Sequence, residues 1–301
     1  MKKLSKLLYL GLIILFLYFP IGALMVLSFN EGKSMNAWQG FSLKWYEEML
    51  QNQEIMEALG NTFTIALWAS VIATVVGVLG CIGLNAMSER KRSLVMGLNN
   101  IPLLNADIVI GISIMLCFLM FGVSLSYGTV LFAHITFCLP YVILSVMPKF
   151  KQLQNLTYEA ALDLGATPVY AFFKVVLPEI MPGIVSGFLL SFTMSVDDFV
   201  ITHFTRGAGI NTLSTLIYSQ VKVGIRPTLY ALSTIIFVTV LVVLIIVNIM
   251  SNREKDGQRS ESMSGRKMIA LFMIVVIAMV GSLQFSLSGQ GAGAGSKELQ
   301  S

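Results

Sequence analysis

The stretch "YEAALDLGATPVYAFFKVVLPEIMPG", Tyr158–Gly183, decides the fold because it is a polar, helix-prone segment between long apolar runs. Thr157 is placed to cap a helix through "YEAALDL", and Gly165 to end that helix in the left-handed conformation that glycine tolerates. Thr167 and Pro168 then begin a second helix, since a hydroxyl cap precedes a proline in the first turn. We expect "LPEIMP" to end this second helix. The segment therefore predicts two short helices joined by a sharp turn.

The outer face of this helical pair has two interpretations. The second helix carries Tyr170, Phe173 and Leu177 on one side, at helical spacing. Such a face could lie on the lipid surface, or it could be a rigid knob that fits a socket on a cytoplasmic protein. Helices that lie on lipid usually have a polar face rich in lysine and arginine. The first helix contains two acids and no base, so the sequence favours the protein socket.

The composition is that of a polytopic membrane protein. Of 301 residues, 55% are hydrophobic and 12% are charged, whereas a soluble domain carries about 25% charged residues. The mean hydropathy is +0.78. Cys81, Cys117 and Cys138 all lie in apolar runs without metal-ligand spacing, so we expect free thiols and no metal site. The net charge of +4 requires no nucleic-acid partner.

An α-helical span needs about 20 mostly apolar residues. Six runs fit: Leu7–Phe29, Leu59–Ala86, Asp107–Gly122, Tyr127–Met147, Ile180–Phe204 and Thr228–Ile249. The third is short and follows "NNIPLLNAD", which predicts a helix broken inside the membrane. The first could be a signal peptide, but it lacks a small-residue cleavage site and precedes an external loop, Glu31–Glu57, with a short amphipathic helix, so we interpret it as an uncleaved span. These six spans form a predicted transmembrane domain, residues 1–250.

The distribution of basic residues predicts the orientation, because cytoplasmic loops are enriched in lysine and arginine. With the N-terminus inside, fourteen of the 20 lysines and arginines are cytoplasmic: Lys2, Lys3, Lys6, Arg90, Lys91, Arg92, Lys149, Lys151, Lys174, Arg253, Lys255, Arg259, Arg266 and Lys267. The opposite orientation would reverse this ratio. We therefore predict a cytoplasmic N-terminus and a cytoplasmic helical pair, residues 157–178.

The C-terminal part has its own pattern. Residues 251–267 are predicted to be a cytoplasmic linker, 268–288 a seventh transmembrane helix that looks like a signal anchor, and 289–301 a flexible extracytoplasmic tail. One interpretation is a fusion to the start of an extracytoplasmic solute-binding protein. The other is an accessory helix with a disordered tail, and the sequence leaves both open.

The helical pair resembles the EAA motif of ABC-importer permease subunits: E-A-A, three residues, G, nine residues, an aliphatic residue, one residue, then L-P. The matching residues are Glu159, Ala160, Ala161, Gly165, Val175, Leu177 and Pro178. The resemblance implies an all-α polytopic membrane protein, with the six-helix type I permease core plus the predicted seventh helix. It also implies a bacterial cytoplasmic (inner) membrane location, and a helical pair that docks on a separate ATP-binding subunit.

The same resemblance implies the partners. They are a second homologous permease subunit, two ATP-binding subunits that hold ATP and Mg²⁺, and an extracytoplasmic solute-binding protein. No cofactor and no catalytic residue is expected in this chain. "GKS" at Gly32–Ser34 lacks the glycine that a phosphate-binding loop needs five positions earlier, where Leu27 stands. For His134 and His203, inside or near spans, we expect structural roles.

Three acids in the spans are candidates for the path of the transported solute: Asp107, Asp197 and Asp198. A charged group inside a bilayer costs about 2.5–3.5 kcal/mol and usually marks a pathway or a partner. Unpaired carboxylates would attract a cation and repel an anion. Alternatively, one or both of the adjacent pair could cap a helix or bond to another helix. Asp197 lies about 18 residues into the fifth span, roughly 25 Å along it.

The segments around these acids extend the resemblance. "ADIVIGISIML", "SFTMSVDDFVITHFTRG" and "QVKVGIRPTLYALSTI" are similar to the C-type permeases of spermidine/putrescine importers. This implies a polyamine cargo, with Phe199 or Trp45 as possible aromatic contacts to an ammonium group. Three alternatives remain: a permease for another cation or a metal complex such as ferric iron, a secondary transporter that uses Asp107 and Asp197 as ion sites, and a membrane scaffold.

Overall fold

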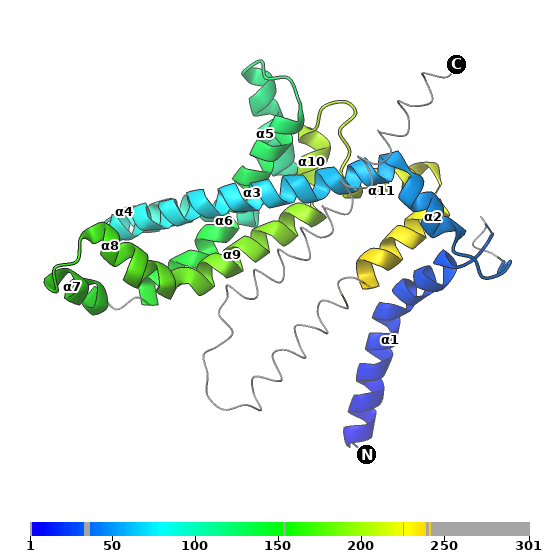
Figure 1. The fold of residues 1–301 in the computed structure, drawn as a ribbon, viewed down its shortest axis with the longest axis horizontal. Coiled ribbons are helices and arrows are strands. Elements are labelled where there is room, and N and C mark those ends of the chain that lie inside the picture. The colour runs from blue at the N-terminus through cyan, green and yellow to red at the C-terminus, as the bar shows by residue number, and fades with distance from the viewer. Residues whose placement is uncertain (1, 33–36, 153–154, 225, 239–240, 242–301) are drawn as a thin grey trace, which may run out of the picture. The chain divides into compact units, whose positions relative to one another are not determined.

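The computed structural model describes residues 2–32, 37–152, 155–224, 226–238 and 241, and this part is helical without any strand (Figure 1). The expected all-α class is therefore confirmed for the described residues. The helices, including one π-helical segment η1, are α1 Lys2–Ser28, α2 Lys44–Gln51, α3 Gln53–Ala86, α4 Glu89–Leu104, α5 Asp107–Met120, α6 Tyr127–Gln152, α7 Asn155–Asp163, α8 Pro168–Ala171, η1 Phe172–Val176, α9 Leu177–Asp197, α10 Val200–Thr205 and α11 Leu213–Val223.

Four helical stretches in the described residues are long and apolar enough to cross a membrane, and a bent pair makes a fifth. The four are Tyr9–Ser28, Gln53–Ala86, Tyr127–Gln152 and Pro168–Asp197. The fifth is α4 with α5, which are bent by 107° at the break between them, as "NNIPLLNAD" predicted. Of the predicted sixth span, the structure describes a shorter apolar helix, Pro227–Val238. The predicted linker, seventh helix and tail, residues 251–301, lie outside the described residues.

The described residues fall into two compact units. One unit holds residues up to Met56 together with those from Leu216 onward, and the other holds Glu57–Thr215. In the first unit, α2 is the amphipathic helix predicted for the external loop. Its Trp45 is buried and donates its indole N–H to the carbonyl of Asn30 at 2.6 Å.

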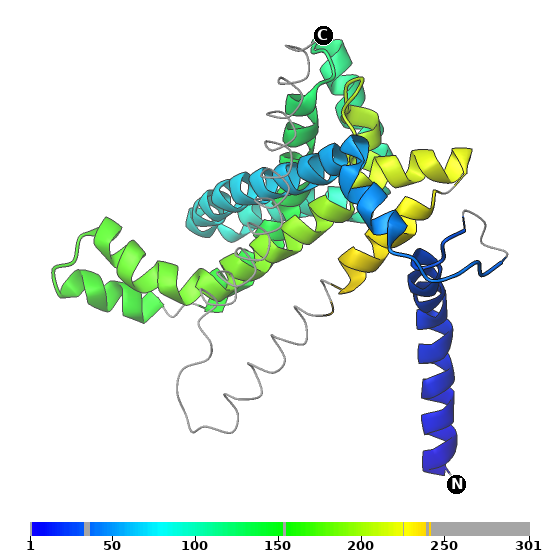
Figure 2. The same cartoon turned by 45° about the vertical axis from the view of Figure 1, so that its right-hand side comes forward.

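The core of the second unit is built around α6, which packs along α9 (Figure 2). Small residues allow this close approach, as is common between membrane helices. A Cβ atom added to Gly187 of α9 would lie 3.3 Å from the Cα atom of Val142 on α6. One added to Gly77 of α3 would lie 2.6 Å from Cγ1 of the same valine. Val142 is therefore a point where both α3 and α9 approach α6 closely.

The predicted turn of the helical pair is confirmed. Gly165 has φ +86, and the N–H of Ala166 donates to the carbonyl of Ala161 at 3.0 Å, a bond typical of a helix that ends in a left-handed glycine. Thr167 accepts a hydrogen bond from the N–H of Tyr170 and caps α8. The predicted start is wrong, because α7 begins at Asn155 and includes Thr157.

The predicted end of the second helix is also wrong. α8 continues through η1 into α9, so Pro168–Asp197 is one apolar helical stretch of 30 residues. Pro178 does not interrupt it, because the proline lies in the first turn of α9, and η1, which ends two residues before it, has hydrogen bonds one residue longer. The N–H of Leu177 donates to Phe172 five residues back. The longer hydrogen bonds of η1 accommodate the proline, which lacks an N–H group and would break a regular helix elsewhere.

Candidate functional site

The fifth predicted span is not one helix through its two acids. α9 ends at Asp197, Asp198 and Phe199 have no helical assignment, and α10 begins at Val200. The prediction of a continuous span from Ile180 to Phe204 is therefore corrected. The two neighbouring carboxylates at this break lie in different environments. The Asp197 residue is exposed in this chain, while the Asp198 side chain is only 5% exposed.

The Asp198 carboxylate binds the start of α10 and so stabilises the break between α9 and α10. Oδ1 accepts a hydrogen bond from the backbone N–H of Ile201 at 3.1 Å, and Oδ2 accepts one from that of Thr202 at 2.8 Å. Oδ2 also accepts the hydroxyl of Thr202 at 3.0 Å. Aspartate that binds the first free N–H groups of a helix stabilises that helix start by about 1 kcal/mol. The alternative that one of the pair caps a helix is thus realised by Asp198.

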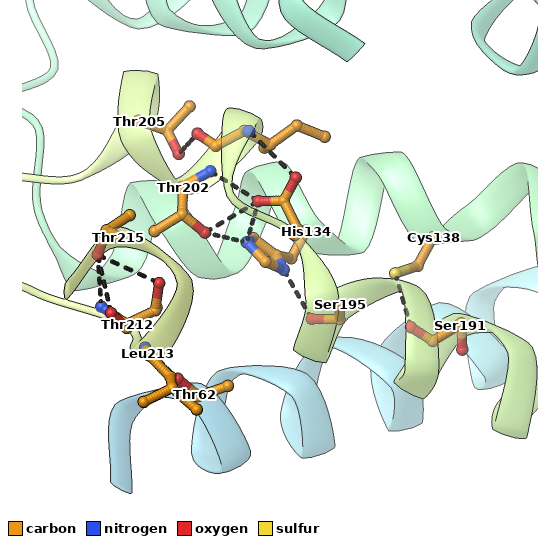
Figure 3. A network of polar contacts seen from close by, with 12 residues as sticks. Thr62, His134, Cys138, Ser191, Ser195, Thr202, Thr205, Thr212, Leu213 and Thr215 are labelled. Atoms are coloured by element: carbon orange, nitrogen blue, oxygen red, sulfur yellow. Dashed lines mark hydrogen bonds and ion pairs between the residues drawn. The ribbon is translucent and has the colours of Figure 1, made fainter. Parts of the chain in front are cut away.

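A buried histidine on α6, His134, lies beside Asp198, and Figure 3 shows its ring between Ser195 and Thr202. The Nδ1 atom of His134 is 2.6 Å from the hydroxyl of Ser195 on α9, and Nε2 is 2.9 Å from that of Thr202 on α10. Nε2 also lies 3.5 Å from Oδ2 of Asp198. One imidazole therefore joins three helices on both sides of the break.

Asp197 lies at the last position of α9 and is exposed in this chain. It makes no hydrogen bond or ion pair with another described residue. A carboxylate at a helix C-terminus is unfavourable, because it faces the negative end of the helix dipole, at a cost of about 0.3–1 kcal/mol. A bound cation would offset this cost.

Asp107 also lies at a break, where α5 begins after the bend that follows α4. It is exposed in this chain and likewise makes no hydrogen bond or ion pair with a described residue. α5 packs against α10, and a Cβ atom added to Gly111 would lie 3.5 Å from the Cα atom of Ile201. The structure therefore brings together the helices that follow the two breaks, while Asp107 and Asp197 stay at helix ends.

Hydrogen bonds to α6 and to α3 hold the end of α10 and the loop that follows it. The backbone carbonyl of Thr205 accepts the hydroxyl of Thr129 on α6 at 2.8 Å. Beyond it, the N–H of Leu213 donates to Thr62 on α3 at 2.8 Å, and Asn61 donates to the carbonyl of Asn211 at 3.0 Å. These bonds fix the segment that follows the break against α3 and α6.

The predicted docking residues lie on α7 and at the η1–α9 junction. Glu159 and Ala160 are exposed, Ala161 is half-buried, and Gly165 forms the exposed turn. The largest exposed apolar side chains nearby are Leu164, Val169, Tyr170 and Phe173, between 58% and 89% exposed. Val175 is half-buried, Pro178 is exposed, and Leu177 packs against the core. The motif therefore combines an exposed surface with an anchor to the core.

The contacts of His134 with Ser195 and Thr202 are not predicted by the sequence. The sequence signal for these contacts is weak, because single serine, threonine and histidine residues in spans often only hydrogen-bond within their own helix. The two aromatic residues predicted to contact an ammonium group differ in placement. Trp45 is buried with its N–H group already bonded, and Phe199 stacks on His203 with ring centroids 5.2 Å apart. Among the described residues, no group of three or more His, Cys, Asp or Glu side chains could hold a metal ion.

Comparison with known proteins identifies the family. Residues 1–256 match the model of the binding-protein-dependent transport system inner membrane component. The chain belongs to this family. It is accordingly a transport permease subunit of the inner membrane, and the described apolar helices fit a multi-pass protein.

Curated relatives narrow the resemblance. The spermidine/putrescine transport system permease protein PotC of Escherichia coli (strain K12) is 36% identical over 246 residues, covering 82% of this chain and 93% of that protein. PotC of Haemophilus influenzae is 37% identical over 238 residues, covering 79% and 93%. The putrescine transport system permease protein PotI of E. coli (strain K12) is 36% identical over 252 residues, covering 81% and 90%.

Solved structures confirm the fold. A bacterial ABC transporter involved in the import of the acidic polysaccharide alginate aligns with a TM-score of 0.65 at 16% identity, over 83% of this chain and 95% of that one. The bacterial alginate ABC transporter in complex with its alginate pentasaccharide-bound periplasmic protein gives 0.62 at 18% identity. At this identity the likeness shows the permease fold and carries no information about cargo.

Proposed function

We propose that this chain is a permease subunit of an ATP-driven importer of polyamines such as spermidine and putrescine. The relatives named PotC and PotI support the cargo class. The structural observation that carries the proposal is the pair of exposed carboxylates, Asp107 and Asp197, which lie at helix ends and make no hydrogen bond or ion pair with a described residue.

Electrostatics favours a cation as the cargo. An ammonium group donates charge-assisted hydrogen bonds to a carboxylate, and these are about twice as strong as neutral ones. Two carboxylates at separate breaks suit a chain with an ammonium group at each end. An anionic cargo would be repelled by the same groups. The solved alginate importers share the fold and import an acidic polysaccharide, so side chains rather than the fold select the cargo.

In this proposal the α7–α8 pair couples transport to ATP hydrolysis. In the proposed orientation this pair is cytoplasmic, and its exposed Leu164, Val169, Tyr170 and Phe173 would bind a groove on a separate ATP-binding subunit. The continuous helix from Pro168 to Asp197 then links the docking surface to the break beside Asp197. Movement of the docked pair would therefore be transmitted along one helix to the proposed cargo site.

The complete importer in this proposal has several chains. A second homologous permease encloses the path, two ATP-binding subunits hold ATP and Mg²⁺, and an extracytoplasmic binding protein delivers the cargo. Closure of the ATP-binding subunits switches the path between the two sides of the membrane. The N-terminus is cytoplasmic, and residues 1–250 form the permease domain.

The test is uptake by proteoliposomes that contain the complete importer, with ATP enclosed and labelled spermidine or putrescine outside with the binding protein. Asp107→Asn and Asp197→Asn should each lower uptake about tenfold or more, since a hydrogen bond to a charged group contributes about 1.5–3 kcal/mol. Glu54→Gln, which changes an exposed acid in the first turn of α3, is the control and should leave uptake unchanged.

The energy source separates this proposal from a secondary transporter. Uptake should require internal ATP and should persist when ionophores collapse the ion gradients. Uptake that follows the ion gradient without ATP would reject the importer mechanism. Equal uptake of spermidine by the wild type and by both aspartate variants would reject the assignment of the path.

A further inference from the structure

The adjacent residues Asp197 and Asp198 lie in opposite environments although they share one peptide bond. Asp197 is exposed at the end of α9, whereas the Asp198 side chain is 5% exposed and accepts three hydrogen bonds. A two-residue interruption of the helix creates this difference. In a continuous helix, neighbouring side chains would point only about 100° apart, so something must hold the interruption in place.

The hydrogen-bond directions around His134 can be assigned from its neighbours. Thr202 has one hydroxyl hydrogen and donates it to Oδ2 of Asp198. The same hydroxyl oxygen must then accept from Nε2–H of His134, 2.9 Å away. In the neutral imidazole, Nδ1 is then an acceptor and receives the hydroxyl hydrogen of Ser195, whose oxygen lies 2.6 Å away. The bonds therefore run in one direction, from Ser195 through the neutral imidazole and Thr202 to the Asp198 carboxylate.

The side chains in this chain of hydrogen bonds are buried, so their pairing is fixed. Ser195, His134 and Thr202 are 3%, 1% and 0% exposed, so none of them can exchange its partner for water. An unpaired buried polar group costs about 1–3 kcal/mol. Each member thus depends on the next, and the four side chains fix the end of α9, the start of α10 and the facing turn of α6 as a unit.

We propose that His134 is a positioning residue that commits Asp198 to the turn between α9 and α10, and so leaves Asp197 as the one carboxylate of the pair that a cationic cargo reaches. This inference rests on the proposed function, because it assigns separate roles to two acids of the same path. His134 acts through Asp198 and the turn and does not touch the cargo.

Two measurements on the purified permease–ATP-binding complex test the inference: equilibrium binding of labelled spermidine without the binding protein, and the thermal unfolding midpoint. Asp197→Asn should raise the spermidine Kd about tenfold or more. It should not lower the unfolding midpoint, since it removes an unfavourable charge at a helix C-terminus. Asp198→Asn should lower the midpoint, because an amide has one acceptor oxygen where the carboxylate uses two.

His134→Ala should lower the midpoint and also raise the spermidine Kd by about three- to tenfold, through displacement of the turn. His134→Gln keeps a donor and an acceptor and should recover most of both losses. In the Asp197→Asn background, neither His134→Ala nor Asp198→Asn should raise the Kd further, because their effects on binding pass through Asp197.

The outcomes are distinguishable. A Kd unchanged by His134→Ala, despite a lower midpoint, would show that His134 contributes only to packing and would overturn the inference. A further rise in Kd from Asp198→Asn in the Asp197→Asn background would make Asp198 a direct ligand and also overturn it. Failure of Asp197→Asn to change the Kd would likewise overturn the inference, whereas a wild-type complex that binds no spermidine would instead reject the proposed function on which the inference rests.

Discussion

At the scale of single residues, Gly207, just after α10, is the glycine of the described second unit where an added Cβ would come nearest to other backbone atoms. A Cβ atom added there would lie 2.4 Å from the backbone oxygen of Leu125 and 3.3 Å from the Cα atom of Ser126. Real Cβ atoms do not come so near to backbone, and neither segment is a flexible side-chain end. The loop after the break therefore packs on the α5–α6 connection only because residue 207 has no side chain.

Gly207→Ala should consequently destabilise the protein by about 1–3 kcal/mol, the usual cost of overpacking. We expect a lower unfolding midpoint and less assembled complex after purification. The matched control is Gly60→Ala on α3, where an added Cβ meets nothing within 4 Å. That change should be neutral or slightly stabilising, since alanine is the better helix former by about 1 kcal/mol. Equal midpoints for both variants would show that the Gly207 contact is not tight in the protein.

At the scale of elements, Gly165 controls the angle between α7 and α8. Its φ of +86 is a conformation that side chains with a branched Cβ strongly disfavour, at a cost of about 1–2 kcal/mol. Gly165→Val should therefore open the turn and displace the exposed residues of α8 from their place beside α7. The expected result is a tenfold or larger loss of ATP hydrolysis coupled to uptake, with normal insertion into the membrane.

Gly122→Val is the matched control for this element. Gly122 has φ +68 at the end of α5, and an added Cβ meets nothing within 4 Å, as at Gly165. The two variants carry similar backbone strain in different turns, so a general loss of stability would affect both. Retention of the ATP-binding subunit in pull-down assays by Gly122→Val and its loss by Gly165→Val would support docking through α7–α8. Retention by both variants would reject it.

Local rules in the sequence predicted some elements and missed others for identifiable reasons. The turn at Gly165, the cap at Thr167 and the break before Asp107 were predictable, because each depends on residues adjacent in the chain. The break after Asp197 was not, because no proline or glycine marks it. It depends on Asp198 meeting His134, 64 positions earlier in the sequence, and this contact exists only once α6 and α9 pack together.

At the scale of the whole molecule, the continuous helix Pro168–Asp197 constrains the orientation. Its 30 residues extend about 45 Å at 1.5 Å per residue, which matches the roughly 40–45 Å thickness of a bilayer with its headgroups. We therefore predict that the segments at its two ends reach opposite sides of the membrane. The excess of basic residues on the side of the α7–α8 pair predicts that this side is cytoplasmic.

Cysteine labelling in intact cells tests this orientation, with Cys81, Cys117 and Cys138 first replaced by alanine. Leu164→Cys and Ala208→Cys place single thiols at exposed positions near the opposite ends of the helix. A membrane-impermeant maleimide added outside should label Ala208→Cys at once and Leu164→Cys only after the membrane is permeabilised. The reverse pattern would place the docking surface outside, away from any source of ATP, and would contradict the proposed importer. Labelling of both thiols in intact cells would show that this helix does not span the bilayer.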